Sequence, residues 1–367
     1  MGAAVNVSGS RVPLRGARFL VLHEFPGAEV ESCWRDFLTN AESPALYNTP
    51  EYFNEPFWND RGPFAVLAFH NGKMVGVMTG IREDNSVICG VQGRPQICIT
   101  KGDTGPCAPS ILAAGLIAEA GTSNLVTVIA WSWVPLSDLE TYGFRRQKMG
   151  GNVVLDLSLG KDALFGGLTK NGRRDVNLAI RRGIEVSEAA SEDDMAAWWE
   201  VYQAWHQNRR KRINSRITAV QSEKLLRLRH NRRIFLARYQ GKVVAASVVR
   251  FYPHGLIEYS SNCSRDEFLH LCPNDLLLWK SIQWACEQGF TKYSLGGAHH
   301  FLRKFGGTIV PIYRYCLDRS FLRMHERKEQ AQWFAQELGD HLPQPIRNAL
   351  RRKGWTVTGL KSEEPSF

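Results

Sequence analysis

A hairpin pattern occurs twice in this chain, at positions that lie 169 residues apart. The two copies are residues 64–77, with the sequence FAVLAFHNGKMVGV, and residues 233–246, with the sequence RIFLARYQGKVVAA. Leu-Ala, Gly-Lys and a following Val occupy the same offsets in both copies, with no gap. Each copy has a β-rich run, a two-residue turn with glycine and a second β-rich run, which is typical of a tight antiparallel hairpin. The constant spacing predicts a duplicated domain.

The length and composition agree with two domains. A chain of 367 residues fits two units of roughly 150–200 residues each. With 44% hydrophobic and 22% charged residues, it has the composition of a soluble globular protein. No run approaches the roughly 18 apolar residues of a spanning helix, and the N-terminus lacks the pattern of a secretory signal. We therefore expect a cytoplasmic protein without a transmembrane segment.

The eight cysteines are scattered along the chain and form no C-x-x-C or C-x-C pair. Cys89, Cys98 and Cys107 are evenly spaced, but nine residues is not a zinc-ligand interval. We therefore expect reduced structural cysteines and no metal site.

The net charge of +10 is unevenly distributed. Residues 209–233, the basic stripe, contain ten Lys or Arg and one acid, Glu223. Further basic pairs stand at 173–174 and 181–182. Such a stripe attracts polyanions, which favours a phosphate-bearing donor or acceptor. The alternative is a solvated basic helix face.

Helix and strand patterns occur before and after each hairpin, in a similar order in the two halves. In the first half we expect strands at 19–24, 86–89, 126–131 and 153–157, and helices at 30–38, 111–120 and 136–142. In the second half we expect helices at 193–207 and 274–288, and strands at 256–261, 292–295 and 310–317, the last closing that half. Residues 323–353 look helical, and the basic amphipathic piece 346–355 is expected to pack on the core, with a membrane surface or nucleic acid as the alternative contact.

Three stretches of the second half carry a family resemblance. They are residues 168–186, which look like a basic helix that opens a domain, residues 272–290, with a Pro-Asn loop before a helix, and residues 293–307, with a Phe-Gly motif. Their order is similar to that of the GNAT acyltransferase fold, and two tandem copies resemble the Fem family of aminoacyl transferases.

This resemblance implies an α+β fold class with two tandem GNAT-like acyltransferase domains. Each domain would be a mixed, mostly antiparallel sheet flanked by helices. The N-terminal, acceptor-side domain would span residues 17–158 and the C-terminal domain, with donor and chemistry, residues 159–320. Residues 321–367 would form a helical basic tail.

Two positions depart from the family pattern. Ser294 stands where relatives often carry an acid, and Leu302 stands where they often carry a lysine. We expect Arg303 or Lys304 to supply the basic contact instead.

Acyl transfer to an amine needs a deprotonated nucleophile, a donor held beside it and hydrogen-bond donors for the developing oxyanion. The chain has no G-x-S-x-G, H-E-x-x-H or P-loop motif, which argues against serine hydrolases, zincins and P-loop enzymes. The coenzyme A loop that the resemblance would place before residue 273 is absent, since residues 269–275 contain no glycine. Aminoacyl-tRNA is therefore favoured slightly over acyl-CoA as donor, because the basic stripe offers phosphate contacts. No tightly bound cofactor is expected.

The candidate site residues fall into three groups. The catalytic candidates are Glu258, Tyr259, Asp275, His299 and Lys304. The donor-binding candidates are Arg173, Arg174, Arg209, Arg210, Pro273, Asn274 and Arg303. The acceptor-binding candidates are Tyr52, Phe53 and Trp58. A carboxylate or imidazole near the amine can act as general base, and strand alternation lets only one of Glu258 and Tyr259 face a site. The helix start at Pro273 can bind an anion through backbone N–H groups, or can be a plain cap.

These observations predict an N-acyltransferase that acts on an amine of a cell-envelope or secondary-metabolite precursor. The acceptor would be a small molecule or a glycan or peptide precursor, and tRNA a possible partner. An acyl-CoA-dependent N-acetyltransferase of a saccharide precursor is one alternative. A non-catalytic protein that binds nucleic acid or saccharide on the same fold is another.

Overall fold

The computed structural model describes residues 5–6, 16–55, 58, 61–102, 107–208, 230–253, 255–325 and 327. The basic stripe up to residue 229, with Arg209 and Arg210, lies outside the described residues, as does most of the predicted tail. The helices are α1 (Ala28–Thr39), α2 (Ala108–Ala120), α3 (Asp138–Thr141), α4 (Gly160–Gly167), α5 (Lys170–Arg181), α6 (Glu192–Asn208), α8 (Pro273–Glu287) and α9 (His300–Arg303). Short 3-10 turns are η1 (Leu46–Asn48), η2 (Pro50–Asn54), η3 (Val91–Gly93), η4 (Leu157–Leu159), η5 (Asp266–Leu271) and η6 (Phe321–Arg323).

The described part contains every predicted strand and three short ones that were not predicted. They are β1 (Val5–Asn6), β2 (Ala17–Leu22), β3 (Pro63–His70), β4 (Lys73–Glu83), β5 (Ser86–Cys89), β6 (Ile97–Ile99), β7 (Leu125–Trp131), β8 (Arg145–Asp156), β9 (Glu185–Glu188), β10 (Arg232–Tyr239), β11 (Lys242–Phe251), β12 (Leu256–Ser264), β13 (Lys292–Ser294) and β14 (Thr308–Asp318).

The two predicted hairpins are β3–β4 and β10–β11. Asn71 and Gln240 have φ of 50°, and the glycine that follows each has φ of 78°. Two successive positive φ values are those of a type I′ turn, whose twist matches the strands that it joins. The register also shifts at equivalent places, after Ala68 in one hairpin and after Ala237 in the other. The two hairpins therefore share the position of the register shift as well as the turn, which confirms the repeat.

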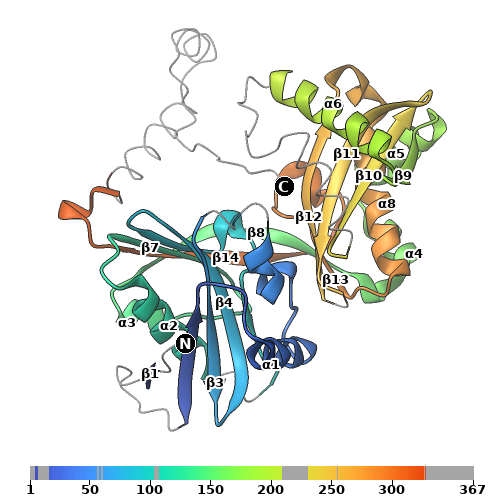
Figure 1. Cartoon of the computed structure of the whole chain (residues 1–367). Coiled ribbons are helices and arrows are strands. Elements are labelled where there is room, and N and C mark those ends of the chain that lie inside the picture. Colours follow the sequence, from blue (N-terminus) through green and yellow to red (C-terminus); the bar gives the residue numbers. More distant parts are fainter. Residues whose placement is uncertain are drawn as a thin grey trace.

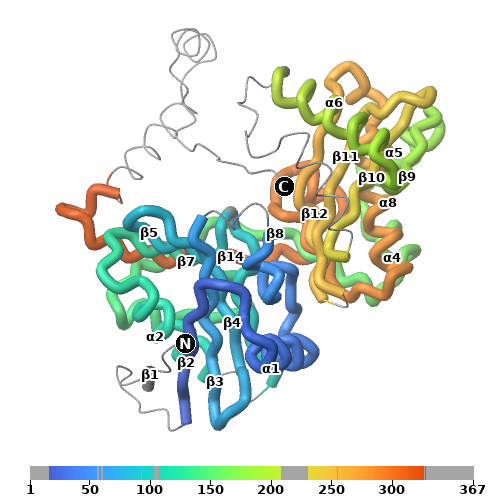
Figure 2. The backbone as a smooth tube through the Cα atoms, in the orientation of Figure 1, coloured from blue at the N-terminus to red at the C-terminus, as the bar shows by residue number. Residues whose placement is uncertain are grey.

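The two halves share one continuous sheet (Figure 1), in the order β1-β2-β3-β4-β5-β7-β14-β8-β13-β12-β11-β10-β9. The expectation that the last strand closes the second half is wrong. β14 instead returns to the first half and pairs with β7 on one side and β8 on the other (Figure 2). β8 in turn pairs with β13. The domain boundary predicted between residues 158 and 159 stays a prediction, because the continuous sheet crosses it and does not mark where one domain ends.

The first-half strand β8 is much longer than the predicted strand at 153–157. Its beginning, Arg145–Lys148, is polar and exposed, so it lacks the apolar alternation that marks a half-buried strand. These residues pair with β14, and the Arg146 guanidinium lies 4.0 Å from the centre of the Tyr313 ring. A cross-strand partner distant in sequence therefore makes this segment a strand.

Helices cover both faces of the sheet in each half. In β3, Val66 and Ala68 pack in the cluster under α2, while Ala65 and Leu67 pack in the cluster under α1. In the second half α5 and α8 cover one face and α6 the other (Figure 1). The cluster under α6 also contains Tyr47, Tyr52 and Trp58 of the first half, so the two halves share a hydrophobic core. Among the helices described, none is long and apolar enough to cross a membrane.

Candidate active site at the divergence of β12 and β13

The parallel strands β12 and β13 pair over three residues and then separate. The last pair joins Glu258 to Ser294, where β13 ends, while β12 continues to residue 264. Ser260 is the extra residue of a β-bulge, because Tyr259 pairs with Val249 and Ser261 pairs with Val248. A bulge bends its strand and locally ends the pairing, and bulges are common beside active sites. The backbone of β12 beyond Glu258 thus has no strand partner on the β13 side.

Gly296 lies directly after this divergence. Its φ is 76°, and a Cβ at this position would come within 2.8 Å of the Tyr259 carbonyl oxygen. A side chain would therefore meet both backbone strain and a backbone clash. Glycine lets the segment after β13 pass close to β12 where the two strands separate.

Glu258 stands at the last paired position and is 4% exposed. Its Oε1 accepts a hydrogen bond from Nη1 of Arg94, a first-half residue just after η3. Its Oε2 is buried and has no hydrogen-bond partner in the described part of the chain. One oxygen of this carboxylate is therefore fixed by the other half of the chain, and the second is buried without a described hydrogen-bond partner.

Two further arginines stand in the same row of the sheet as Glu258. Arg250 is its cross-strand partner on β11, and Arg232 is the partner of Arg250 on β10. Arg250 donates a hydrogen bond of 2.7 Å to the Tyr47 hydroxyl oxygen. Burial raises the pKa of Tyr47 although Arg250 and Arg94 act in the opposite direction. The phenol is therefore neutral at physiological pH.

Arg232 forms the other buried ion pair between the halves. Its Nη2 lies 2.5 and 2.6 Å from the two carboxylate oxygens of Glu55. Burial alone would raise the pKa of Glu55, but the nearby arginines, Arg232 foremost, outweigh it and lower the pKa. The contact between the halves thus contains two buried ion pairs, Arg94–Glu258 and Arg232–Glu55, each with one residue from each half.

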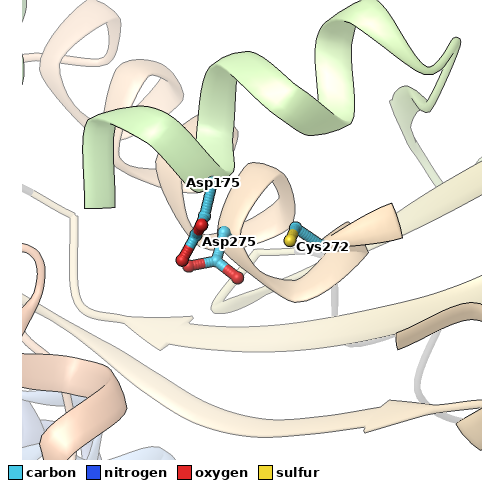
Figure 3. A group of neighbouring side chains, drawn as sticks. All are labelled: Asp175, Cys272 and Asp275. Atoms are coloured by element: carbon cyan, nitrogen blue, oxygen red, sulfur yellow. The ribbon is translucent and has the colours of Figure 1, made fainter. Parts of the chain in front are cut away.

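A second charged group lies at the start of α8. Asp175 of α5 and Asp275 of α8 turn their carboxylates toward each other, with Cys272 beside them (Figure 3). Lys304 donates from Nζ to both, at 2.6 Å to Asp175 Oδ2 and in a second bond to Asp275 Oδ1. Cys272 has φ of 58° and precedes the helix. Although the ligand atoms of these three residues lie within 4.8 Å of one another, the positive charge between the two carboxylates is the Lys304 ammonium. We call these four residues the α8 ion cluster.

The two carboxyl groups of this cluster titrate differently. For Asp175, burial is outweighed by hydrogen bonds from Lys304 and Arg174, and its pKa is lowered. For Asp275, burial outweighs the bond from Lys304, and its pKa is raised. Burial opposes the charge of Lys304 as well, but the two carboxylates raise its pKa. The cluster thus keeps Lys304 charged.

Replacing each acid by asparagine is expected to show this difference. Ionised Asp175 stabilises the fold above an unfolded pKa of about 3.9, and the contribution disappears as pH falls through its lower folded pKa. Asp175→Asn should therefore lower the free energy of unfolding at pH 7 by on the order of 1 kcal/mol more than Asp275→Asn. Urea unfolding of both variants between pH 3 and 7 measures this difference, which should shrink toward pH 3. Equal losses throughout that range would refute the assignment.

Residues 169–304 match the family model described as acetyltransferase (GNAT) domain. This region is therefore similar to GNAT-type acetyltransferase domains, and we call it the GNAT domain. Three solved structures are similar to the whole arrangement. FemX has a TM-score of 0.61 and 13% identity, over 82% of this chain and 98% of that one. L-PGS from Bacillus licheniformis has a TM-score of 0.55 and 16% identity, over 82% and 94%. A tandem GNAT protein from the clavulanic acid biosynthesis pathway has a TM-score of 0.53 and 12% identity, over 83% and 99%.

These similarities confirm the predicted fold of two tandem GNAT-like units. No curated protein matches the chain. The GNAT domain contains β12, β13 and α8, so the divergence at Glu258 lies within the part that the family model covers.

The other predicted catalytic residues lie apart from Glu258. Tyr259 points into the core on the α8 side, where burial raises its pKa well above the usual range. Its hydroxyl is buried and has no described hydrogen-bond partner. His299 lies on an exposed surface before α9, stacked on Phe301, and partial burial together with His300 lowers its pKa. Asp275 and Lys304 belong to the α8 ion cluster.

The predicted donor-binding residues have mostly local partners. Arg173 donates to the carbonyl oxygens of Gly166 and Leu168 at the end of α4. Arg174 pairs with Asp175 at 2.8 Å, and Arg303 donates to the Ala298 carbonyl oxygen.

Pro273 and Asn274 begin α8, as predicted. Asn274 donates to the Ser264 hydroxyl oxygen at 3.2 Å. Its Oδ1 is buried and has no described partner. Asn274 is thus the donor-binding candidate with an unused acceptor atom.

The three predicted acceptor-binding aromatics separate into two groups. The Tyr52 and Trp58 rings stack with centroids 6.2 Å apart and belong to the core shared by the halves. Phe53 packs instead beside Trp34 in the core under α1. Only Tyr52 and Trp58 therefore lie toward the GNAT domain.

Arg94 is the residue of this site that sequence reasoning missed. It stands between the strand predicted at 86–89 and the helix predicted at 111–120, and its partner is 164 residues away. Arg250 and Glu258 carried a weak indication, because each is a charged residue between two hydrophobic neighbours in a strand. No comparable indication marks Arg94.

Proposed function

We propose that this chain is an N-acyltransferase that moves an aminoacyl or acyl group from an activated ester or thioester to an amine. The observation that carries the proposal is Glu258 at the divergence of β12 and β13, with one oxygen held by Arg94 and the other unpartnered. A carboxylate with one available oxygen, beside strands that no longer pair, suits general-base catalysis. The GNAT fold of the surrounding domain supports the same class of reaction.

The reaction follows from this placement. The amine nitrogen attacks the carbonyl carbon of the donor, so that a C–N bond forms while the C–O bond of an aminoacyl ester, or the C–S bond of a thioester, breaks. Glu258 Oε2 takes a proton from the amine, and the leaving oxygen or sulfur receives a proton. Backbone N–H groups beyond Glu258 are candidates to stabilise the developing oxyanion. Neither a covalent nucleophile nor a metal is needed for this sequence of steps.

Aminoacyl-tRNA is the favoured donor. Two of the ten basic residues of the basic stripe serve the fold, since Arg232 pairs with Glu55 and Arg233 pairs with Glu188 at 3.0 Å. The other eight, all between residues 209 and 229, are the proposed phosphate contacts. The first turn of α8 carries Asp275, which faces Asp175, so two carboxylates and one ammonium stand where a coenzyme A diphosphate would approach. This arrangement disfavours acyl-CoA.

Acyl-CoA remains the second candidate donor for a specific reason. The similar tandem GNAT protein is named with reference to AcCoA and belongs to the clavulanic acid biosynthesis pathway. That likeness supports a small-molecule precursor as acceptor. A cell-envelope precursor is the second acceptor class that we propose.

The test offers both donors to the whole chain. Radiolabelled aminoacyl-tRNA and radiolabelled acetyl-CoA are supplied separately with a panel of amines that contains glucosamine, lysine and putrescine, and amide products are detected by mass. We expect transfer from aminoacyl-tRNA that RNase treatment abolishes. Transfer from acetyl-CoA alone, resistant to RNase, would assign the donor to the second candidate. Binding of tRNA or saccharide without transfer from either donor would contradict the proposed function.

A further inference from the structure

The loop that carries Arg94 is held in place by several side-chain hydrogen bonds. Trp131 Nε1 donates to the Gly93 carbonyl oxygen at 2.8 Å, and Asn48 Nδ2 donates to the Pro95 carbonyl oxygen at 3.0 Å. Gln96 accepts from the Val91 backbone N–H at 2.7 Å and donates to the Tyr52 hydroxyl at 2.8 Å. A buried loop with this many specific hydrogen bonds has little freedom to move. Arg94 therefore contacts the GNAT domain from a rigid loop.

The GNAT domain holds Glu258 equally firmly from its own side. Glu258 pairs with Arg250 on β11 and with Ser294 on β13, in the middle of the sheet. Tyr47, which accepts from Arg250, also lies against Arg94, with the guanidinium 5.9 Å from its ring centre. Both members of the Arg94–Glu258 pair are more than nine-tenths buried. The orientation of the Glu258 carboxylate is thus set by a residue of the other half.

A general base is effective only when its free oxygen points at the proton that it removes, and a misplacement of about 1 Å can cost about 10²-fold in rate. We propose that Arg94 is a positioning residue for acyl transfer. By binding Oε1 of Glu258 it directs Oε2 toward the amine at the divergence of β12 and β13. This inference rests on the proposed function and on Glu258 as its base. It gives the first half a part in the chemistry of the second.

The test is a double-mutant cycle on steady-state acyl transfer, with aminoacyl-tRNA and the amine that the panel identifies. Arg94→Met should lower kcat by about 10²-fold with little change in KM. In a Glu258→Gln background the same substitution should lower kcat no further, because Arg94 acts through Glu258. Arg94→Lys keeps the charge and one hydrogen-bond donor and should restore part of the rate. Arg232→Met is the matched control, since it breaks the other buried ion pair between the halves and should leave kcat of the folded protein within about threefold.

A merely structural Arg94 gives a different pattern. It would lower kcat in the Glu258→Gln background as well, by about the same factor as in the wild-type background. If Arg94→Met does not fold, Arg94→Lys carries the test, with kcat lowered at unchanged KM as the expected result and wild-type kcat as the result that overturns it.

The outcomes also separate this inference from the proposed function. If the wild-type chain transfers and Glu258→Gln is fully active, the inference fails and the function stands. If the wild-type chain transfers from neither donor, both fail.

Discussion

Replacing Glu258 by glutamine is expected to lower kcat for acyl transfer by about 10²–10⁴-fold, the usual contribution of a general base. The amide is similar in size and still offers an oxygen to Arg94, but it cannot accept the amine proton at Oε2. Steady-state kinetics of the folded variant, with its secondary structure checked by circular dichroism, measure this effect. KM for the donor should change little, because the substitution removes an interaction made in the transition state.

Glu55→Gln provides the matched control for this substitution. Glu55 is also a buried glutamate that pairs with an arginine across the contact between the halves, but its partner is Arg232, two strands from Glu258. It should lose stability and keep kcat. A comparable loss of kcat in both variants would mean that buried charge at this contact, and not a base at Glu258, supports activity.

Replacing Arg232 by methionine is expected to have the largest effect on stability. It leaves the Glu55 carboxylate buried without the Arg232 guanidinium, whose Nη2 binds both of its oxygens, and breaking such a pair typically costs about 3–5 kcal/mol. Urea unfolding at pH 7 measures the free energy of unfolding. Because the folded pKa of Glu55 is lowered, its contribution is present above an unfolded pKa of about 4.3 and is lost as pH falls through the folded value. The difference between wild type and variant should therefore shrink in acid.

The double variant Arg232→Met with Glu55→Gln tests the cause of that loss. Without a carboxylate at residue 55, the uncompensated charge disappears, and the double variant should be more stable than Arg232→Met alone. A loss below about 1 kcal/mol in Arg232→Met, or no recovery in the double variant, would show that the pair contributes little to holding the halves together.

Much of the fold could be predicted because its patterns are local. The hairpin turns at Asn71 and Gln240 combine a two-residue loop with glycine, and both strands of each hairpin are rich in β-branched and aromatic residues. The repeat distance of these hairpins then implied the duplication. The helix α8 was also predicted within one residue, because Pro273 and the acid at Asp275 mark its first turn.

The parts that could not be predicted depend on contacts between distant segments. β14 follows the GNAT domain in sequence, and nothing in residues 308–318 indicates that they insert between β7 and β8 of the first half. The same holds for Arg94 and Glu258, and for Glu55 and Arg232, which lie 164 and 177 residues apart. Periodicity and turn chemistry describe neighbours along the chain, and these pairs are neighbours only in space. The prediction of Lys304 as a catalytic candidate and basic contact did not include its partner Asp175 for the same reason.

The most direct test of the central claim is the single-turnover rate of transfer from aminoacyl-tRNA to the acceptor amine, measured with enzyme in excess over the donor. This rate reports the chemical step without product release. We expect wild type and Glu55→Gln to consume the donor at similar rates, and Glu258→Gln to be slower by about 10²–10⁴-fold. Equal rates for Glu258→Gln and wild type would contradict a general base at the divergence of β12 and β13.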